Sequence, residues 1–434
     1  MDEDVRIRLR GLSPRQLVVI CATAVDDERR LWRSHGKFRA DESGCVDVTS
    51  QESMSGSYCG LSPAGLLWSM RLVENHTNGP SVFVKKNAYS DSVSFEAEVG
   101  GQIVASAKLD RLFFALGTMT RDLKVGGETI GDTEEAGGGP LEGHIARLFI
   151  PPGHGPHPVV IVLAGSGGGF DLDKASVLSR HGFATLAIAY FGIPPLPSWL
   201  HRVPLDYFEA ALAWLAAQPE IDSERTGVLG ISRGAELALL LGAMIPQIRA
   251  VVAYAPSSTA WAAGGRDEAT GELIPTWTWR GAPVPFAPLP LRGFMLRSAV
   301  PVVLLRRPVI FRNLFREALR NREEVARAAI PVEKIRGSVL LVSGGDDRVW
   351  PAAEMSEAMV SRLRQRGFTH GVEHLHYPRA GHNLRYPHLP TTSRQSRNRH
   401  LRNAKFFYGG TAAADAEAQT DSWRRAIAFL QRYL

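Results

Sequence analysis

The most informative residues in the sequence are a serine and the glycines around it, in the run Gly230-Ile-Ser-Arg-Gly234. The apolar residues 228–231 predict a buried parallel strand, and the good helix formers at 236–244 predict a helix soon after it. A G-x-S-x-G motif between a strand and a helix is typical of a nucleophile elbow, in which glycines let both elements approach closely around a strained serine. We therefore predict that Ser232 is a nucleophile; a plain glycine-flanked turn is the alternative.

A serine hydroxyl becomes a good nucleophile only when a base removes its proton and an acid orients that base. In hydrolases built on this element, the acid follows the serine in the chain and the histidine comes last, each just past a strand. The loop after the predicted strand 339–342 contains two adjacent candidates, Asp346 and Asp347. We assign Asp347, because the Arg-Val-Trp-Pro run after it has the spacing usual behind such an acid. Asp346 stays the alternative, and either carboxylate could instead cap a turn.

The predicted base is His382, which follows a flexible glycine in a loop behind the predicted strand 372–376. A loop in this place can bring its histidine over the edge of the sheet to Ser232. The nearby His370, His374 and His376 also raise the question of a metal site. No cysteine or further carboxylate converges on them in the sequence, so we predict neither a metal nor a cofactor.

The oxyanion of an acyl-transfer reaction needs two backbone N–H donors. We assign the amide of Arg233 as the first donor. The second is expected from the glycine-rich run 164–170, which follows the predicted strand 159–164; we assign Ser166, with Gly167 as the alternative. A plain turn between strand and helix is the other interpretation. A phosphate-binding loop is excluded, because neither G-K-[ST] nor G-x-G-x-x-G spacing is present.

The segments that must position these residues alternate between strand and helix patterns. Alternating units of this kind imply a mostly parallel, doubly wound sheet, so we predict an α/β-hydrolase domain over residues 141–434. The predicted strands are 141–149, 159–164, 183–189, 228–231, 250–254, 339–342 and 372–376, and the predicted helices are 174–181, 205–218, 236–244, 352–366 and 421–433. An irregular insertion rich in Pro, Trp and Arg, at about 256–330, is expected either to cover the site as a lid or to form a surface excursion.

Residues 1–125 have a different pattern, with little helical periodicity. Strand composition recurs at 16–22, 81–84 and 93–99, and the last of these alternates apolar and polar residues as a half-buried strand does. We predict an N-terminal antiparallel β-sandwich. The glycine-rich, acidic residues 126–140 are interpreted as a linker between the two domains.

Composition and charge narrow the functional classes. The chain has 434 residues, 44% of them hydrophobic and 22% charged, which is ordinary for a globular protein. The net charge of +6 comes without a zinc-finger, RRM or helix-turn-helix signature, so a nucleic-acid partner is not predicted. No apolar run reaches membrane-spanning length, and the charged first residues lack the apolar core of a secretory signal. We therefore expect a cytoplasmic protein without a membrane span.

The cysteines give a weaker indication in the same direction. There are three, Cys21, Cys45 and Cys59. A low, odd number favours free, buried thiols in a reducing compartment. A disulfide between Cys21 and Cys59 is the alternative.

With these motifs in place, the chain resembles the family of acyl-CoA thioesterases and bile-acid-CoA:amino-acid N-acyltransferases. The similarity extends nearly from end to end, and the combination of both halves is more specific than any single motif. It is carried by residues 7–14, 38–41, 55–60 and 65–70 in the front half and by 164–169, 206–210, 230–234, 330–335 and 380–382 in the back half. The resemblance implies a β-sandwich before an α/β-hydrolase domain, with Ser232, Asp347 and His382 as the catalytic triad.

By the same resemblance, the substrate is an acyl-CoA or another acyl thioester, and the reaction is hydrolysis through an acyl-enzyme. The family also contains an amino-acid transferase with cysteine at the elbow, so Ser232 favours water as the acceptor. Three alternatives stay open: transfer of the acyl group to an amine or alcohol, a carboxylesterase that does not use CoA, and a catalytically silent binding protein. One departure from the family is that Arg233 and Ala235 stand where Lys and Gly are common.

Overall fold

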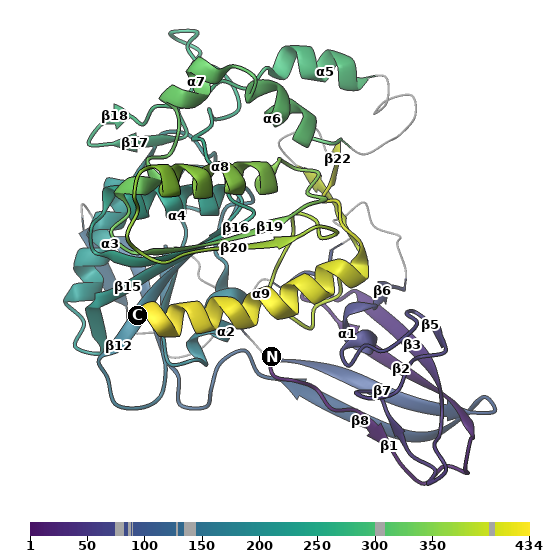
Figure 1. Ribbon diagram of the computed structural model, residues 1–434. Coiled ribbons are helices and arrows are strands. Elements are labelled where there is room, and N and C mark those ends of the chain that lie inside the picture. The colour runs from purple at the N-terminus through teal and green to yellow at the C-terminus, as the bar shows by residue number, and fades with distance from the viewer. Residues whose placement is uncertain are drawn as a thin grey trace.

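A computed structural model of the protein describes residues 1–73, 82–85, 88, 90–126, 129–133, 145–299, 309–398 and 404–434. Within these residues the centre of the molecule is a nine-stranded sheet with the order β10-β9-β11-β13-β12-β15-β16-β19-β20 (Figure 1). The six strands from β13 to β20 are parallel to one another, and β9, β10 and β11 add antiparallel strands at one edge. The bounds are β9 (Met119–Gly126), β10 (Thr129–Thr133), β11 (Ala146–Ile150), β12 (His157–Leu163), β13 (Ala184–Ile188), β15 (Ile221–Ile231), β16 (Ile248–Tyr254), β19 (Ser338–Gly344) and β20 (Val372–Tyr377).

Helices cover both faces of this sheet (Figure 1). One face carries α3 (Asp206–Ala216), α4 (Arg233–Met244) and α8 (Ala352–Gln365), and the other carries α2 (Leu172–Ser179) and α9 (Ala412–Tyr433). The strand β12 explains why both faces need cover: Ile161 belongs to the core under α3, α4 and α8, whereas its neighbours Val160 and Val162 belong to the core under α2 and α9. A strand buried on both sides is continuously apolar, as the sequence pattern predicted. The mostly parallel, doubly wound α/β arrangement is thereby confirmed.

The last helix is longer than predicted. It starts at Ala412, not at residue 421. The Thr411 side chain accepts a hydrogen bond from the backbone N–H of Ala414 at 3.2 Å, which caps the helix, and the alanines that follow are the best helix formers. The longer first turns place Asp415 next to the loop of His382.

The N-terminal part of the chain is antiparallel, as predicted. Its larger sheet has the order β5-β3-β2-β7-β8, with β6 paired to β3, and β1 pairs β4 separately. The bounds are β1 (Arg8–Leu9), β2 (Leu17–Val25), β3 (Leu31–Arg39), β4 (Val46–Asp47), β5 (Ser55–Gly56), α1 (Gly65–Trp68), β6 (Arg71–Leu72), β7 (Asp91–Val99) and β8 (Gln102–Arg111). The strand predicted at 81–84 is wrong for its described residues 82–84, which lie in a loop. There Phe83 buries its ring 5.5 Å from that of Trp32, so its apolar character serves packing without a strand.

The large sheet includes residues that precede the predicted start of the second domain at residue 141. The strand β9 pairs with β11. Arg147 on β11 donates a hydrogen bond from Nε to Oδ1 of Asp122 on β9 at 2.6 Å, and both side chains are almost fully buried. Within the predicted linker 126–140, residues 129–133 form β10, and residues 127–128 and 134–140 lie outside the described part. The domain limits and the sandwich arrangement stay predictions.

The N-terminal part packs against the side of the sheet that carries α2 and α9 (Figure 1). The Asp2 carboxylate lies 2.7 Å from His181 Nε2 and accepts a hydrogen bond from the indole of Trp423 on α9 at 2.7 Å. The buried apolar residues of the N-terminal sheet and those under α2 and α9 form one continuous cluster. A single core therefore connects the front half of the chain with one face of the large sheet.

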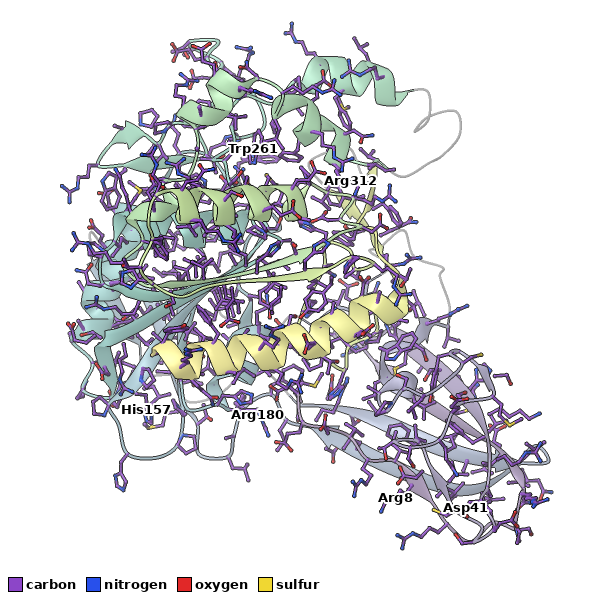
Figure 2. The ribbon with its side chains drawn as sticks, in the orientation of Figure 1. Arg8, Asp41, His157, Arg180, Trp261 and Arg312 are labelled. Carbon is purple, nitrogen blue, oxygen red and sulfur yellow. The ribbon has the colours of Figure 1, made fainter. Side chains whose placement is uncertain are left out.

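The insertion at about 256–330 is less irregular than predicted. Its described residues form β17 (Trp277–Trp279), β18 (Ala282–Pro283), α5 (Leu291–Ala299), α6 (Arg312–Ala318) and α7 (Arg322–Arg327), and β17 pairs with β14 (Val203–Pro204). These elements lie beyond α4 and α8, and Figure 2 places Trp261 between them and these helices. Other described elements are the 3₁₀ helix Val332–Lys334 and the antiparallel pair of β21 (Gln395–Asn398) and β22 (Ala404–Phe407).

Two further expectations concern the cysteines and the membrane. Cys21, Cys45 and Cys59 are all free, so the alternative Cys21–Cys59 disulfide is absent. The expectation that the thiols are buried holds for Cys21 and is wrong for Cys59, which is exposed. In the part of the chain that the structure describes, no helix is both long and apolar enough to cross a bilayer.

A buried ion pair at the inner end of the N-terminal sheet gives a first prediction. Arg111 donates from Nε and Nη2 to the Asp91 carboxylate at 2.6 and 2.7 Å, and from Nη1 to the carbonyl of His388 at 3.0 Å. Asp91→Ala should lower the free energy of unfolding by about 3–5 kcal/mol, because it leaves the Arg111 charge buried without its carboxylate. Denaturant unfolding measures this loss.

The neighbouring strand β8, which also carries Arg111, offers a matched control. Asp110 pairs with Lys108 on the surface, with about two-thirds of each side chain exposed. Asp110→Ala should cost less than about 1 kcal/mol. Equal losses in the two variants would contradict the importance of the buried pair.

Candidate active site

Ser232 lies at the tip of a sharp turn between β15 and α4. Its backbone has φ 58° and ψ −121°, a conformation that a residue with a side chain adopts only under strain. A Cβ on Gly230 would come within 2.1 Å of the Gly234 carbonyl oxygen, and one on Gly234 within 2.3 Å of the Ala164 carbonyl oxygen. Both positions therefore require glycine, and the strand–turn–helix context that the sequence predicted is present.

The three residues predicted to act together form one hydrogen-bonded chain. Ser232 Oγ lies 2.9 Å from His382 Nε2, and His382 Nδ1 lies 2.7 Å from Asp347 Oδ2. With Nδ1–H donating to the carboxylate, Nε2 is left free to accept the serine proton. All three are buried, with exposed fractions of 8% for Ser232, 5% for His382 and 1% for Asp347.

The two candidate acids differ in what they contact. Asp347 holds its second oxygen, Oδ1, in hydrogen bonds from the backbone N–H groups of Val349 at 2.8 Å and Trp350 at 3.2 Å. These bonds fix the carboxylate so that Oδ2 faces His382. Asp346 instead pairs with Arg348 at 2.6 Å and accepts the N–H of Gly410 at 3.0 Å. Of the two, the structure brings Asp347 to the histidine.

The loops of the predicted oxyanion donors lie beside Ser232. The N–H of Arg233 is the first of α4, where helix amides have no partner inside the helix and the helix dipole favours negative charge. A Cβ on Gly165 would lie 3.5 Å from the Cβ of Ser232, so the backbone of this loop packs directly against the serine side chain. Gly168 donates its N–H to Gly165 and Gly169 to Phe191. The amides of Ser166 and Gly167 donate to no acceptor among the described residues, and both stay candidates for the second donor.

Two aromatic rings enclose the imidazole of His382. The ring of Trp350 meets it edge-on with centroids 5.9 Å apart, and the ring of Tyr408 lies nearly parallel to it with centroids 6.2 Å apart. Apolar surroundings of this kind restrict water and strengthen the electrostatic interactions inside. The sequence analysis did not identify Tyr408, because its place beside His382 depends on a strand that returns from far along the chain.

The Arg233 side chain is a second feature that the sequence analysis missed. It turns away from solvent, donates to Glu236 at 2.7 Å and to the Trp261 carbonyl at 3.2 Å, and lies over the Trp277 ring. Glu236 also accepts the Trp277 indole N–H at 2.7 Å. Burial raises the pKa of Glu236, and the Arg233 charge opposes this shift. The network connects the elbow helix α4 to the insertion. The only feature of the sequence that could have indicated this network is the arginine at position 233, where the resembled family commonly has lysine.

The histidines that raised the question of a metal site are placed differently from His382. His374 Nε2 and His376 Nδ1 both face the hydroxyl of Ser343, at 2.8 and 3.3 Å. Across the described ranges, no three or more His, Cys, Asp or Glu side chains gather as ligands would. The chemistry that the arrangement supports is proton removal from a serine hydroxyl by an oriented histidine.

Comparison with known proteins identifies the family of this chain. The family model described as "BAAT / Acyl-CoA thioester hydrolase C terminal" matches residues 203–434, and the one described as "Acyl-CoA thioester hydrolase/BAAT N-terminal region" matches residues 2–125. Both matches agree with the resemblance seen in the sequence.

Curated relatives match over the whole chain. The mouse peroxisomal succinyl-coenzyme A thioesterase is 29% identical over all of this chain and 94% of its own length. Mouse acyl-coenzyme A thioesterase 1 is 31% identical, with the same coverage, and mouse acyl-coenzyme A amino acid N-acyltransferase 1 is 30% identical over all of this chain and 95% of its own length. Because one relative is named as peroxisomal, the cytoplasmic location stays a prediction. The model matches and the full-length identity together place this chain in the acyl-CoA thioester hydrolase/BAAT family.

Proposed function

We propose that this protein hydrolyses acyl-CoA, or a related acyl thioester, with Ser232 as nucleophile, His382 as base and Asp347 as its orienting acid. The observation that carries the proposal is the hydrogen-bonded chain from the serine hydroxyl through the imidazole to the carboxylate, at the tip of a strained elbow. Relatives named as acyl-CoA thioesterases over the full chain support the substrate class.

In the first half of the reaction, His382 Nε2 takes the proton of Ser232 as Oγ attacks the thioester carbonyl carbon. Asp347 stabilises the imidazolium that forms. The negative oxygen of the tetrahedral intermediate accepts hydrogen bonds from the N–H groups of Arg233 and Ser166, each worth about 3 kcal/mol where such donors have been removed. The carbon–sulfur bond then breaks, the thiol leaves with the proton from His382, and the acyl group stays on Ser232.

In the second half, water replaces the thiol. His382 removes a proton from the water, whose oxygen attacks the acyl carbon. The ester bond to Ser232 breaks, and His382 returns the proton to Oγ, which regenerates the starting state. A thiolate is a good leaving group, so support of the oxyanion contributes more than protonation of the sulfur.

The second candidate function is transfer of the acyl group to an amine. The relative named as an amino acid N-acyltransferase favours it, and so does the low exposure of Ser232, because a water-poor site protects an acyl-enzyme from hydrolysis. The serine at position 232 favours hydrolysis, since the resembled transferase carries cysteine at the elbow.

One experiment separates these candidates. The protein is incubated with a panel of acyl-CoA esters, with and without amino acids, while free thiol, free acid and amide are measured. Thiol and acid in equal amounts, unchanged by amino acids, support hydrolysis. Amide product would favour the transferase, and activity on nitrophenyl esters without activity on any acyl-CoA would favour a carboxylesterase.

The nucleophile gives the second prediction. Ser232→Ala should reduce thioester turnover below about one-thousandth of the original, because no other hydroxyl can form the acyl-enzyme. The thermal midpoint should stay within a few degrees. Ser361→Ala on the exposed side of α8 makes the same chemical change away from the site and should keep full turnover. Undiminished turnover in Ser232→Ala would remove this residue from the mechanism.

The choice between the two acids gives the third prediction. Asp347→Asn should lower kcat by a factor on the order of 10⁴, because the amide cannot stabilise the imidazolium and favours the wrong tautomer of His382. Asp346→Asn, which changes the neighbouring carboxylate in the same way, should lower kcat less than about tenfold. Steady-state kinetics with one acyl-CoA measures both, and a larger loss in Asp346→Asn would reverse the assignment.

A further inference from the structure

A short segment that runs from the end of β22 into the first turn of α9 contacts the loops of Asp347 and His382. We call residues 406–415 the strap. The Tyr408 carbonyl accepts the backbone N–H of His382 at 2.9 Å, and the Tyr408 ring stacks on the imidazole. The next residue, Gly409, forms an antiparallel β-bridge with Asp347. One segment therefore fixes the backbone of both the acid and the base.

The fit of the strap between the two loops is close. Gly409 and Gly410 have φ values of 80° and 72°, which favour glycine. A Cβ on Gly409 would come within 1.8 Å of the Asp346 carbonyl oxygen, and one on Gly410 within 2.3 Å of Asp415 Oδ1. Because nothing larger fits, a shift of the strap would move the loops with it.

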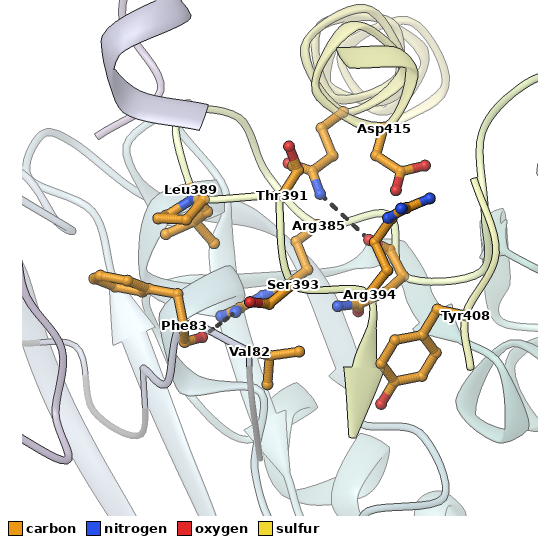
Figure 3. A pocket seen from close by; sticks show the side chains of 12 residues that line it. Val82, Phe83, Arg385, Leu389, Thr391, Ser393, Arg394, Tyr408 and Asp415 are labelled. Carbon is orange, nitrogen blue, oxygen red and sulfur yellow. Dashed lines mark hydrogen bonds between the residues drawn. The ribbon is translucent and has the colours of Figure 1, made fainter. Parts of the chain in front are cut away.

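Asp415 extends this contact from helix α9. Its Oδ1 accepts the backbone N–H of Gly381 at 2.7 Å, and the residue is 7% exposed. Figure 3 shows its carboxyl group pointing from the helix toward Arg394, in a pocket that Tyr408 also lines. The volume of this pocket is about 20 Å³, too small to hold an acyl chain.

The strap thus holds two consecutive amides of the base loop, that of Gly381 through the Asp415 side chain and that of His382 through the Tyr408 carbonyl. A buried N–H group without an acceptor is costly, so the loop is stable only where both acceptors are in place. We propose that Asp415 is a positioning residue: by accepting the Gly381 N–H, its carboxyl group holds the loop in the place from which His382 reaches Ser232.

The charges around Asp415 make this contact sensitive to pH. Burial raises the pKa of Asp415 to about 7, and the Gly381 N–H and Arg394 oppose the shift. From the acid loop, the charges of Asp346 and Asp347 act in the same direction as burial, and the value of about 7 already includes their smaller contributions. The carboxyl group therefore changes from neutral to charged near neutral pH.

The direction of the effect follows from hydrogen bonding. Above about pH 7 the carboxylate makes a charge-assisted bond to the Gly381 N–H, which is stronger than the bond to a neutral acid. The added negative charge near the acid loop also favours the imidazolium that forms when His382 takes the serine proton. Ionisation of Asp415 should therefore increase the reactivity of Ser232.

The inference rests on the proposed triad, and its test uses a readout that needs no thioester substrate. The second-order rate constant for modification of Ser232 by a fluorophosphonate is measured at pH 6 and pH 8.5. The proteins compared are the original chain, Asp415→Asn, Asp415→Ala and Glu417→Gln. The last makes the same change from carboxylate to amide on the exposed side of α9 and serves as the control.

Asp415→Asn should react within about twofold of the original chain at pH 6, because its amide oxygen can still accept the Gly381 N–H, and about fivefold more slowly at pH 8.5. Asp415→Ala should react about tenfold more slowly at both pH values, and Glu417→Gln should match the original chain. A rate ratio for Asp415→Asn that does not change with pH would overturn the proposal, and this near-isosteric variant decides even if Asp415→Ala does not fold. Full reactivity of folded Asp415→Ala would also overturn it, whereas an original chain that does not react at all would refute the nucleophile assignment instead.

Discussion

The whole site depends on one constraint, that an imidazole from one loop must stay within hydrogen-bonding distance of a hydroxyl and a carboxylate from two others. The residues concerned, Ser232, Asp347 and His382, follow β15, β19 and β20. Parallel strands place their carboxyl ends at the same edge, which brings the three loops near each other but does not fix them to a few tenths of an ångström. The distances of 2.9 and 2.7 Å must be held by what packs around the loops.

That packing comes from three parts of the chain distant in sequence. The elbow is held from the insertion side, where Arg233 and Glu236 join α4 to Trp261 and Trp277. The base loop is held by the strap and by α9, whose acceptor groups form hydrogen bonds with its backbone amides. The N-terminal part shares its apolar core with α2 and α9, so it supports the same helix that carries the strap. A site of three residues therefore rests on elements from both halves of the chain.

The sequence pointed to the residues of the proposed triad because their signals are local. Glycines at 230 and 234 are demanded by backbone contacts within a few residues, and the strands before Asp347 and His382 are short apolar runs of clear pattern. The same reasoning could not choose between Asp346 and Asp347 from geometry, since adjacent residues in a loop point in different directions only once the loop is folded.

What the sequence did not reveal depends on contacts across long separations. Tyr408 and Asp415 lie beside His382 because a hairpin and a helix return to the sheet, and nothing near them in the sequence marks that return. Residues 119–125 fall within the predicted N-terminal domain because a glycine-rich stretch follows them, although they belong to β9, which pairs with β11 of the large sheet. A strand composition at residues 82–84 likewise reflected only the burial of Phe83 in a loop. Local pattern predicts which segments are apolar, whereas pairing and packing decide where they go.

Asp347 and Asp415 both lie near His382, but they differ in how well hydrogen bonds compensate for their burial. Asp347 is almost fully buried, but two backbone amides and the imidazole satisfy both of its oxygens, so its charge is supported where the proposed reaction needs it. Asp415 is buried with one backbone amide as donor, and burial raises its pKa to about 7. A second full charge so close to Asp347 is unfavourable, so the Asp415 carboxyl group stays neutral below about pH 7 and ionises as the pH rises above it. The same imidazole is thus served by one carboxylate that orients it directly and by another that holds its loop.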